Sequence, residues 1–144
     1  MRKIILLLLA LTTFLMAEVN WQPDYRSAKA EAQKTGKPML VLLVSHTCRW
    51  CRKLENRTLQ NPRVVDYINQ HFVPVIVYRE DRGDDENPAY PDFIESSMVP
   101  ATFFLTPDEE TIIQPSIGYW EPVDYMSDLT MAIRFFEKRK QTDQ

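Results

Sequence analysis

The chain contains two cysteines, Cys48 and Cys51, which are separated by only two residues. Cysteine sulfurs at this spacing suit two kinds of chemistry, because a thiolate can attack a disulfide or bind a metal ion. A disulfide that serves stability gains most when it closes a long loop, and this pair would close almost none. The spacing therefore favours a pair that does chemistry over one that only stabilises the fold.

The sequence around the pair favours a reactive thiolate at Cys48. The unbroken apolar run Met39–Val44 predicts a strand buried on both faces, and a helical pattern runs from about Trp50 to Leu59. Cys48 then lies at a helix N-terminus, where free N–H groups and the helix dipole lower the pKa of a thiol. Cys51, one turn further on, can reach a mixed disulfide formed on Cys48. Positive charge acts in the same direction and comes from Arg49, Arg52 and Lys53.

Helix and strand signals alternate along the rest of the chain. Gly36 and Pro38 end the helix before the first strand, and Pro122 begins the last helix. Helices are expected at 25–35, 50–59, from 62, at 92–97 and from 122, and strands at 39–44, 72–78, 101–105 and 111–118. The last helix should bury Met126, Leu129, Ile133 and Phe136. This order predicts an α/β fold whose mixed central sheet of about four or five strands is flanked by helices on both faces.

The motifs on these elements resemble the thioredoxin fold. A Cys-x-x-Cys pair between a buried strand and a helix is followed, about fifty residues later, by Val99-Pro100 ahead of another strand. The resemblance extends from about Trp21 to Phe136. It is similar in particular to the thioredoxin-like branch exported to the bacterial periplasm, which includes the soluble domains of thiol:disulfide interchange proteins. The other matching segments are Gly36-Lys37-Pro38, Val73, Ala101-Thr102-Phe103 and Gly118-Tyr119.

This resemblance implies a thiol-disulfide oxidoreductase that uses Cys48 and Cys51, with reduction of protein disulfides as the expected direction. It implies a cis peptide bond before Pro100, packed against the cysteine pair, which leaves the backbone of Val99 free to pair with an extended substrate. The expected partners are proteins with disulfides or thiols and a membrane thiol-electron carrier. No cofactor and no metal are expected. The expected substrate-binding residues are Arg49, Trp50, Val99 and Pro100.

Two positions depart from the thioredoxin pattern. Thioredoxin carries a buried acid six residues before its first active cysteine, and this chain has Leu42 there. The usual proton acceptor for the resolving step is therefore missing, and Glu55, one helical turn after Cys51, is the candidate replacement. The residues inside the motif are Arg49 and Trp50 in place of Gly-Pro, a dipeptide that helps to set reduction potential. The direction of electron flow is thus open to test.

The first residues predict export. Arg2 and Lys3 precede an uncharged stretch, 4–16, and Ala17 provides a small residue before a cut, which is the pattern of a secretory signal peptide. An uncleaved anchor is the alternative. The expected division is a signal peptide at 1–17 and a thioredoxin-like domain at 18–144, periplasmic and outside the membrane after cleavage. Loss of the signal leaves 15 basic against 20 acidic residues, a net charge of −5, which disfavours nucleic-acid binding.

Other classes of function compete with the redox interpretation. Two cysteines and two histidines could bind zinc or copper, although their spacing matches no common zinc finger. A redox-inactive binding module or chaperone could use the groove of the fold alone. A c-type haem site needs His directly after the second cysteine, where this chain has Arg52. The four side chains of the metal alternative are His46, Cys48, Cys51 and His71.

Two further features are expected near the cysteines. The polar connection 79–91 follows the second strand and should rise beside the pair, because parallel strands end at one edge of the sheet. We hypothesise that its acidic residues select the redox partner. Trp50 is expected to form an exposed apolar lip for substrate. Tyr119 and Trp120 could belong either to that lip or to the core.

Overall fold

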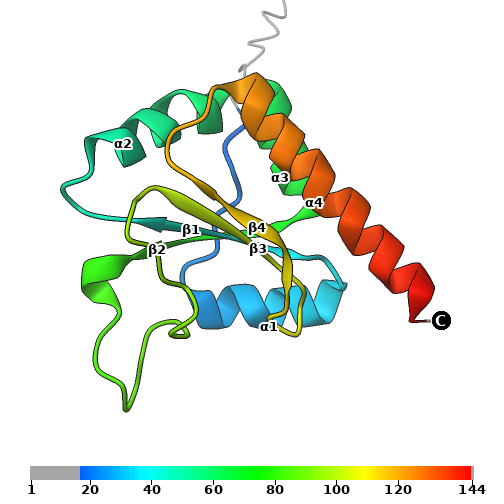
Figure 1. Ribbon diagram of the computed structural model, residues 1–144, viewed down its shortest axis with the longest axis horizontal. Coiled ribbons are helices and arrows are strands. Elements are labelled where there is room, and N and C mark those ends of the chain that lie inside the picture. The colour runs from blue at the N-terminus through cyan, green and yellow to red at the C-terminus, as the bar shows by residue number, and fades with distance from the viewer. Residues whose placement is uncertain (1–16, 144) are drawn as a thin grey trace, which may run out of the picture.

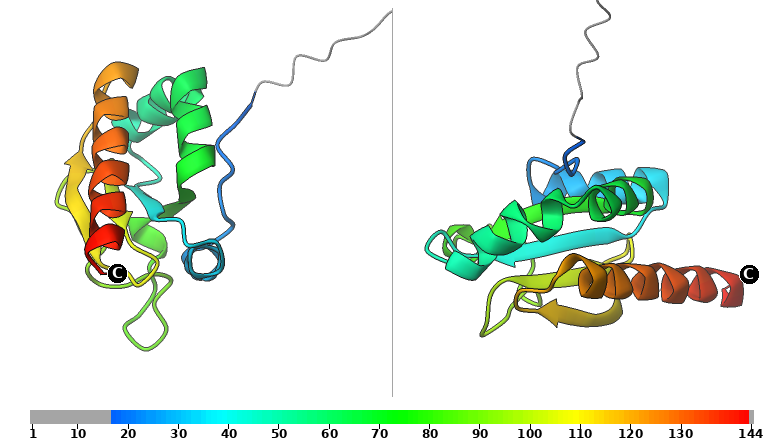
Figure 2. Two further views of the ribbon diagram at one scale, coloured as in Figure 1. Left: turned by 90° about the vertical axis from the view of Figure 1, so that its right-hand side faces the viewer. Right: turned by 90° about the horizontal axis from the view of Figure 1, so that it is seen from above.

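The computed structural model describes residues 17–143 (Figures 1 and 2). The predicted signal peptide lies outside the described residues, except for Ala17. The helices are α1 (Tyr25–Thr35), α2 (Arg49–Asn56), α3 (Pro62–His71) and α4 (Pro122–Thr142), with short 3-10 turns at η1 (Thr58–Gln60) and η2 (Arg79–Asp81). The strands are β1 (Met39–Val44), β2 (Val73–Tyr78), β3 (Ala101–Leu105) and β4 (Thr111–Ile117).

The four strands form one mixed sheet in the order β2-β1-β3-β4. β1 pairs with β2 in parallel, whereas β1 with β3 and β3 with β4 are antiparallel. Figure 1 shows α1 on one side of this sheet and α2, α3 and α4 on the other. The predicted α/β thioredoxin architecture, parallel at the front and antiparallel at the back, is confirmed.

Local sequence signals set the ends of the first helices. The Asp24 carboxylate caps α1 by accepting a hydrogen bond from Ser27 N at 2.7 Å. Gly36 ends α1 with a φ of 73°, a left-handed conformation that favours glycine. The Asn61 side chain caps α3 in the same way, directly before Pro62. These ends fix where β1 and β2 begin.

The six residues of β1 are all buried, as the apolar run predicts, and they serve two cores. Leu40, Leu42 and Val44 face the core beneath α2, α3 and α4. Met39, Val41 and Leu43 face the other core, which α1 and the segment around Tyr90 and Ile94 cover. A strand buried on both faces holds the residues that follow it firmly at the sheet edge.

The predicted buried stripe of α4 is partly wrong. Leu129 and Phe136 are buried as expected, but Met126 and Ile133 are only partly buried. Tyr125 and Ala132 take the central positions instead, and both are fully buried. Tyr125 is placed inward because its hydroxyl lies 2.8 Å from the Thr102 hydroxyl of β3, which gives this buried polar group a partner.

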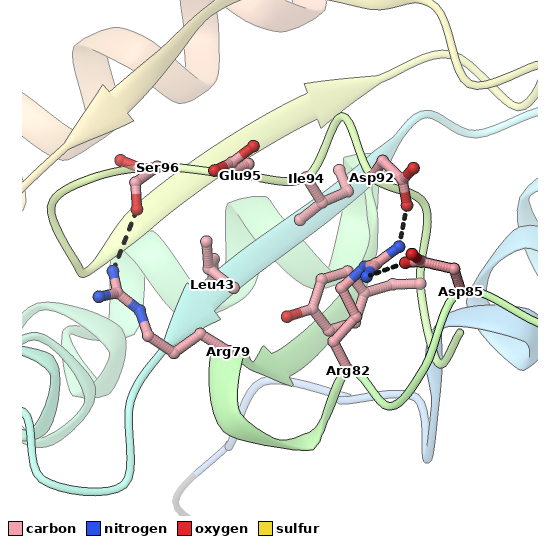
Figure 3. Close-up of a pocket in the computed structure, with 9 residues that line it drawn as sticks. Leu43, Arg79, Arg82, Asp85, Asp92, Ile94, Glu95 and Ser96 are labelled. Carbon is pink, nitrogen blue, oxygen red and sulfur yellow. Dashed lines mark hydrogen bonds and ion pairs between the residues drawn. The ribbon is translucent and has the colours of Figure 1, made fainter. Parts of the chain in front are cut away.

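The predicted helix at 92–97 is wrong, and α2 is shorter than expected. The 92–97 segment forms turns, which are held by two arginines that precede it along the chain. Arg79 donates a hydrogen bond to the Ser96 carbonyl, and Arg82 forms an ion pair with Asp92 (Figure 3). α2 ends at Asn56, and a 3-10 turn follows in which the Thr58 hydroxyl donates to the Trp120 carbonyl. Tertiary contacts therefore override both local patterns.

Candidate active site

The topology brings three chain segments to one edge of the sheet. β1 runs into the cysteine motif, and β2 ends beside it because the two strands are parallel, with Val44 opposite Tyr78. β3 is antiparallel to β1 and pairs Ala101 with Leu43, so the residues before Ala101 lie at the same edge. The cysteine pair, the loop after β2 and the Val99-Pro100 segment thus meet.

Cys48 and Cys51 form a disulfide with a Cα–Cα distance of 5.2 Å. Cys48 is the N-cap of α2, and its Sγ accepts a hydrogen bond from Cys51 N at 3.1 Å. The predicted position at a helix N-terminus is therefore confirmed. When the bond is reduced, the same N–H and the helix dipole would stabilise a thiolate on Cys48.

The two sulfurs differ in access. Cys51 is 1% exposed and belongs to the core beneath α2, whereas Cys48 is partly exposed. An incoming disulfide can reach Cys48 directly, but it can reach Cys51 only after contact with Cys48. The arrangement separates an outer sulfur suited to attack from an inner sulfur suited to resolution.

The Val99-Pro100 peptide bond is cis, as expected, and Pro100 is buried. The Val99 carbonyl oxygen lies 3.6 Å from Cys48 Sγ. The Pro100 carbonyl accepts a hydrogen bond from Gly118 N at 2.7 Å, which ties this turn to the end of β4. The backbone next to Cys48 is therefore fixed in place.

Trp50, inside the cysteine motif, belongs to an aromatic and basic cluster. Trp50 is half exposed, and its ring lies 5.9 Å from the Tyr119 ring. Lys53 Nζ lies 4.8 Å from the Trp50 ring centroid and 4.5 Å from that of Tyr119. Tyr119 thus belongs to this exposed lip and also touches the core, while Trp120 is 42% exposed. Arg49, inside the motif, is exposed.

The loop after β2 lies against the residues that precede Cys48. Glu80 accepts hydrogen bonds from the Ser45 hydroxyl and from His46 N. His46 stacks on Tyr78 with ring centroids 4.2 Å apart, and its Nε2 lies 2.8 Å from an Asp81 carboxylate oxygen. Ser45 hydrogen bonding lowers the pKa of the exposed Glu80 carboxyl. The predicted position beside the cysteine motif is confirmed only for the start of the loop, at Glu80 and Asp81. Residues 87–91 instead border a cavity together with the start of α1 and Glu109. No motif in the sequence indicated the His46–Tyr78 stack.

The outer part of this loop is only partly an acidic surface. Arg82 pairs with both Asp85 and Asp92, and together with Arg79 it borders a cavity of about 470 Å³ above Leu43 (Figure 3). The acids that extend into solvent without a basic partner among the described residues are Asp84 and Glu86.

A second, smaller cavity of about 250 Å³ is lined by Cys51 but not by Cys48. Cys51 and Glu55 line it from one face of α2. Glu55 is half-buried, and burial raises the pKa of its carboxyl while the Arg52 charge lowers it to a smaller extent. The remaining lining residues are Val44, Ser45, His46, Arg52 and Tyr78.

The four candidate metal ligands are not gathered into one site. Cys48 and Cys51 bond to each other, His46 pairs with Asp81, and His71 packs on Tyr67 at the end of α3. Between Ala17 and Asp143, no three His, Cys, Asp or Glu side chains are grouped to hold a metal ion. Across the same residues, no helix has the length and apolar character needed to cross a membrane.

Comparison with known proteins shows which family this chain belongs to. Residues 10–139 match the Thioredox_DsbH family, which is described as "Protein of unknown function, DUF255". The chain belongs to this family. Membership in Thioredox_DsbH agrees with the predicted thioredoxin-like superfamily.

The chain is also similar to part of an animal protein. Spermatogenesis-associated protein 20 of Rattus norvegicus is 30% identical over 132 residues, which cover 85% of this chain. The chain spans only 16% of the length of that relative. The similarity therefore concerns the thioredoxin-like part, and the activity of the longer protein does not carry over.

Two solved structures show the same fold. The structure named "DsbH Oxidoreductase" has a TM-score of 0.64 at 17% identity, covering 82% of this chain and 86% of its own. A thioredoxin from Thermus thermophilus has a TM-score of 0.65 at 22% identity, covering 80% of this chain and 86% of its own. The identities are low, so these likenesses establish the fold alone.

Proposed function

We propose that this protein is a thiol-disulfide oxidoreductase in which Cys48 attacks and Cys51 resolves. The observation that carries the proposal is the pairing of a partly exposed Cys48, capping α2, with a buried Cys51 bonded to it. Membership in Thioredox_DsbH and the shared fold of the DsbH oxidoreductase support a redox role. A binding module without redox activity would need no such difference between the two sulfurs.

The proposed reaction balances in two steps. The Cys48 thiolate attacks a substrate disulfide, forms a mixed disulfide and releases one substrate thiolate. Cys51 loses its proton and attacks Cys48 Sγ, which forms the Cys48–Cys51 bond and releases the second substrate thiolate. Two electrons pass from the protein dithiol to the substrate disulfide, and no cofactor takes part.

The substrate groove in this proposal lies between Trp50 and the Val99-Pro100 turn. An extended polypeptide could pair with the Val99 backbone and bring its disulfide to Cys48, 3.6 Å from the Val99 carbonyl. The exposed Trp50 ring offers apolar contact, and Arg49 offers charge. The partners that fit this groove are extended protein segments that carry a disulfide or thiols.

We further propose that the protein works in the periplasm and reduces its substrates there. The basic and apolar first residues support export, and an oxidising compartment would require a membrane thiol-electron carrier to return the pair to the dithiol. Equilibration with glutathione tests the direction. A potential near that of thioredoxin, about −270 mV, would support reduction, whereas one near about −120 mV would reverse it.

A thiol titration tests the redox proposal itself. We expect no reactive thiol in the protein as oxidised, and two per chain after reductant is added and removed. The reduced protein should then reduce a protein disulfide and return to the bonded form. Thiols that appear but cannot reduce any disulfide would favour the binding module instead.

The loop after β2, whose first residues lie beside those that precede Cys48, should affect the choice of partner. Replacing Asp84, Asp85 and Glu86 by Asn, Asn and Gln removes three negative charges from an exposed surface. Arg82 keeps Asp92 as a partner, so the loop should hold its shape. We expect association with a basic protein disulfide to slow about threefold to tenfold in low salt and to lose much of its salt dependence.

Stopped-flow rates at two ionic strengths would measure this effect. A small neutral disulfide should react at an unchanged rate. The matched control replaces Asp124, Glu137 and Asp143 on or next to α4 by Asn, Gln and Asn, which removes the same charge elsewhere. Equal rates for the loop variant and the wild type with the basic substrate would make the loop a solvated connection only.

A further inference from the structure

The resolving step needs a proton acceptor, and the position that supplies one in thioredoxin is apolar here. Leu42 is fully buried in β1, among the residues of the core beneath α2. Cys51 belongs to the same core, where ionisation of its thiol is unfavourable without a nearby base. Another group must therefore take up the Cys51 proton.

Glu55 lies where such a base would be useful. Residues four apart share one helix face, and helical side chains lean toward the N-terminus, so Glu55 leans back toward Cys51. Both residues line the same cavity of about 250 Å³, which has room for water between them. Among residues 17–143, the Glu55 carboxylate has no hydrogen-bond or ion-pair partner that would occupy it.

We propose that Glu55 accepts the proton of the Cys51 thiol, through water in this cavity, when Cys51 attacks the mixed disulfide. The inference rests on the proposed oxidoreductase function and names the acceptor for its second step. The proton moves from Cys51 Sγ to the Glu55 carboxylate, the Cys51–Cys48 bond forms, and the substrate thiolate leaves. Glu55 then returns its proton to solvent through the cavity opening.

The other groups around the cavity fit this assignment. Arg52, on the same helix, favours the ionised carboxylate that can act as a base. His46 is the other possible acceptor, but its Nε2 pairs with Asp81 and its ring stacks on Tyr78. The charged and titratable groups that face the cavity or bind its wall are Arg52, His46, Tyr78, Glu80 and Asp81.

The direction of the Glu55 shift sets the expected pH profile. Burial raises the pKa of the Glu55 carboxyl from its usual range and so brings it closer to neutral pH. A base works only when it is deprotonated. The rate of the resolving step should therefore fall as pH drops through the raised pKa of Glu55, and it should be level above that pKa until Cys51 ionises unaided.

The test follows the two steps separately. Reduced protein is mixed with one equivalent of dithiobis(nitrobenzoic acid), which releases one coloured thiolate when Cys48 attacks and a second when Cys51 resolves. In Glu55→Gln the first phase should change less than about twofold. The second phase should slow about tenfold to a hundredfold near neutral pH, and the deficit should shrink at alkaline pH.

Control variants separate the chemistry from a change in structure. Glu31→Gln, on α1, removes another half-buried carboxylate far along the chain from the cysteines and should leave both phases unchanged. Glu55→Asp keeps a carboxylate one methylene shorter and should recover part of the second-phase rate. His46→Asn should leave the second phase within about twofold of the wild type.

The outcomes distinguish this inference from the proposed function. If Glu55→Gln resolves as fast as the wild type with the same pH profile, or if His46→Asn is the slow variant, Glu55 is not the acceptor, although the oxidoreductase function stands. If the wild type releases fewer than two coloured thiolates per chain, the proposed function fails first. A slow second phase confined to Glu55→Gln, with recovery at alkaline pH, supports the inference.

Discussion

Cys48→Ser should lose disulfide reductase activity by more than about 10³-fold, because the variant lacks the partly exposed thiol at the start of α2. The serine oxygen would occupy the same N-cap position but would not form a thiolate-like nucleophile at neutral pH. Steady reduction of a protein disulfide measures the loss. Urea unfolding of the reduced proteins provides the control, since a polar N-cap should leave the fold intact.

Cys51→Ser should fail at a different step. The partly exposed Cys48 can still attack, but no second sulfur is present to release the substrate, so covalent mixed disulfides should accumulate. Mass spectrometry under denaturing conditions without reductant would detect them. In the reduced wild type, alkylation should modify Cys48 before Cys51, because Cys51 is 1% exposed. Faster alkylation of Cys51, or mixed disulfides that accumulate on Cys48→Ser, would reverse the assigned roles.

Much of the fold could be predicted because its signals are local. The apolar run 39–44, the caps at Asp24 and Asn61 and the glycine at Gly36 each act within a few residues. The segments that were predicted wrongly depend on distant contacts. The turns at 92–97 are held by Arg79 and Arg82 from the preceding loop, and no periodicity within 92–97 records that constraint.

The prediction of which α4 residues are buried was partly wrong for a related reason. Hydrophobicity alone ranks Met126 and Ile133 above a tyrosine as buried residues. The structure buries Tyr125 because the Thr102 hydroxyl, on β3, satisfies its phenol. Burial raises the pKa of that phenol well above its usual range. A sequence pattern cannot identify this partner, which lies 23 residues away along the chain.

The candidate site also has parts that the sequence predicts and parts that depend on distant contacts. Cys48 and Cys51 are recognisable from the sequence because their motif is short, whereas the cis bond before Pro100 was expected only from the resemblance to the thioredoxin fold. The cavity shared by Cys51 and Glu55 is not, because His46 and Tyr78 must close it from other segments. The spacing of four between Cys51 and Glu55 was the only local signal for it.

A large effect on stability is expected if a carboxyl is placed at the fully buried position of Leu42, in contrast to the half-buried position of Glu55. Leu42→Asp would place a carboxyl at the position of the thioredoxin acid, but in a strand buried on both faces. The nearby Thr102 and Tyr125 hydroxyls already pair with each other, so at most one hydrogen remains for the new group. We expect the free energy of unfolding to fall by about 3 to 5 kcal/mol at pH 7.

The pH dependence of this loss separates charge from packing. Burial should raise the pKa of the inserted carboxyl in the folded state above its unfolded value of about 3.9. The folded state then binds the proton more tightly than the unfolded state, so stability falls as pH rises between the two pKa values. Leu42→Asn introduces a side chain that matches aspartate in size and cannot ionise. Its free energy of unfolding should be lower than that of the wild type by an amount that does not change with pH, because the packing of Leu42 is lost and the new amide is unpaired.

Urea unfolding of both variants and the wild type at pH 4 and pH 7 measures the two parts. Near pH 4 the variants should be almost equally unstable, and at pH 7 Leu42→Asp should be less stable than Leu42→Asn by at least about 2 kcal/mol. Equal stability at pH 7 would mean that the site can solvate a carboxylate. It would then be as suitable for a proton acceptor as the Glu55 cavity. The expected difference instead reflects a core that excludes charge at Leu42 and admits it only beside the opening at Glu55.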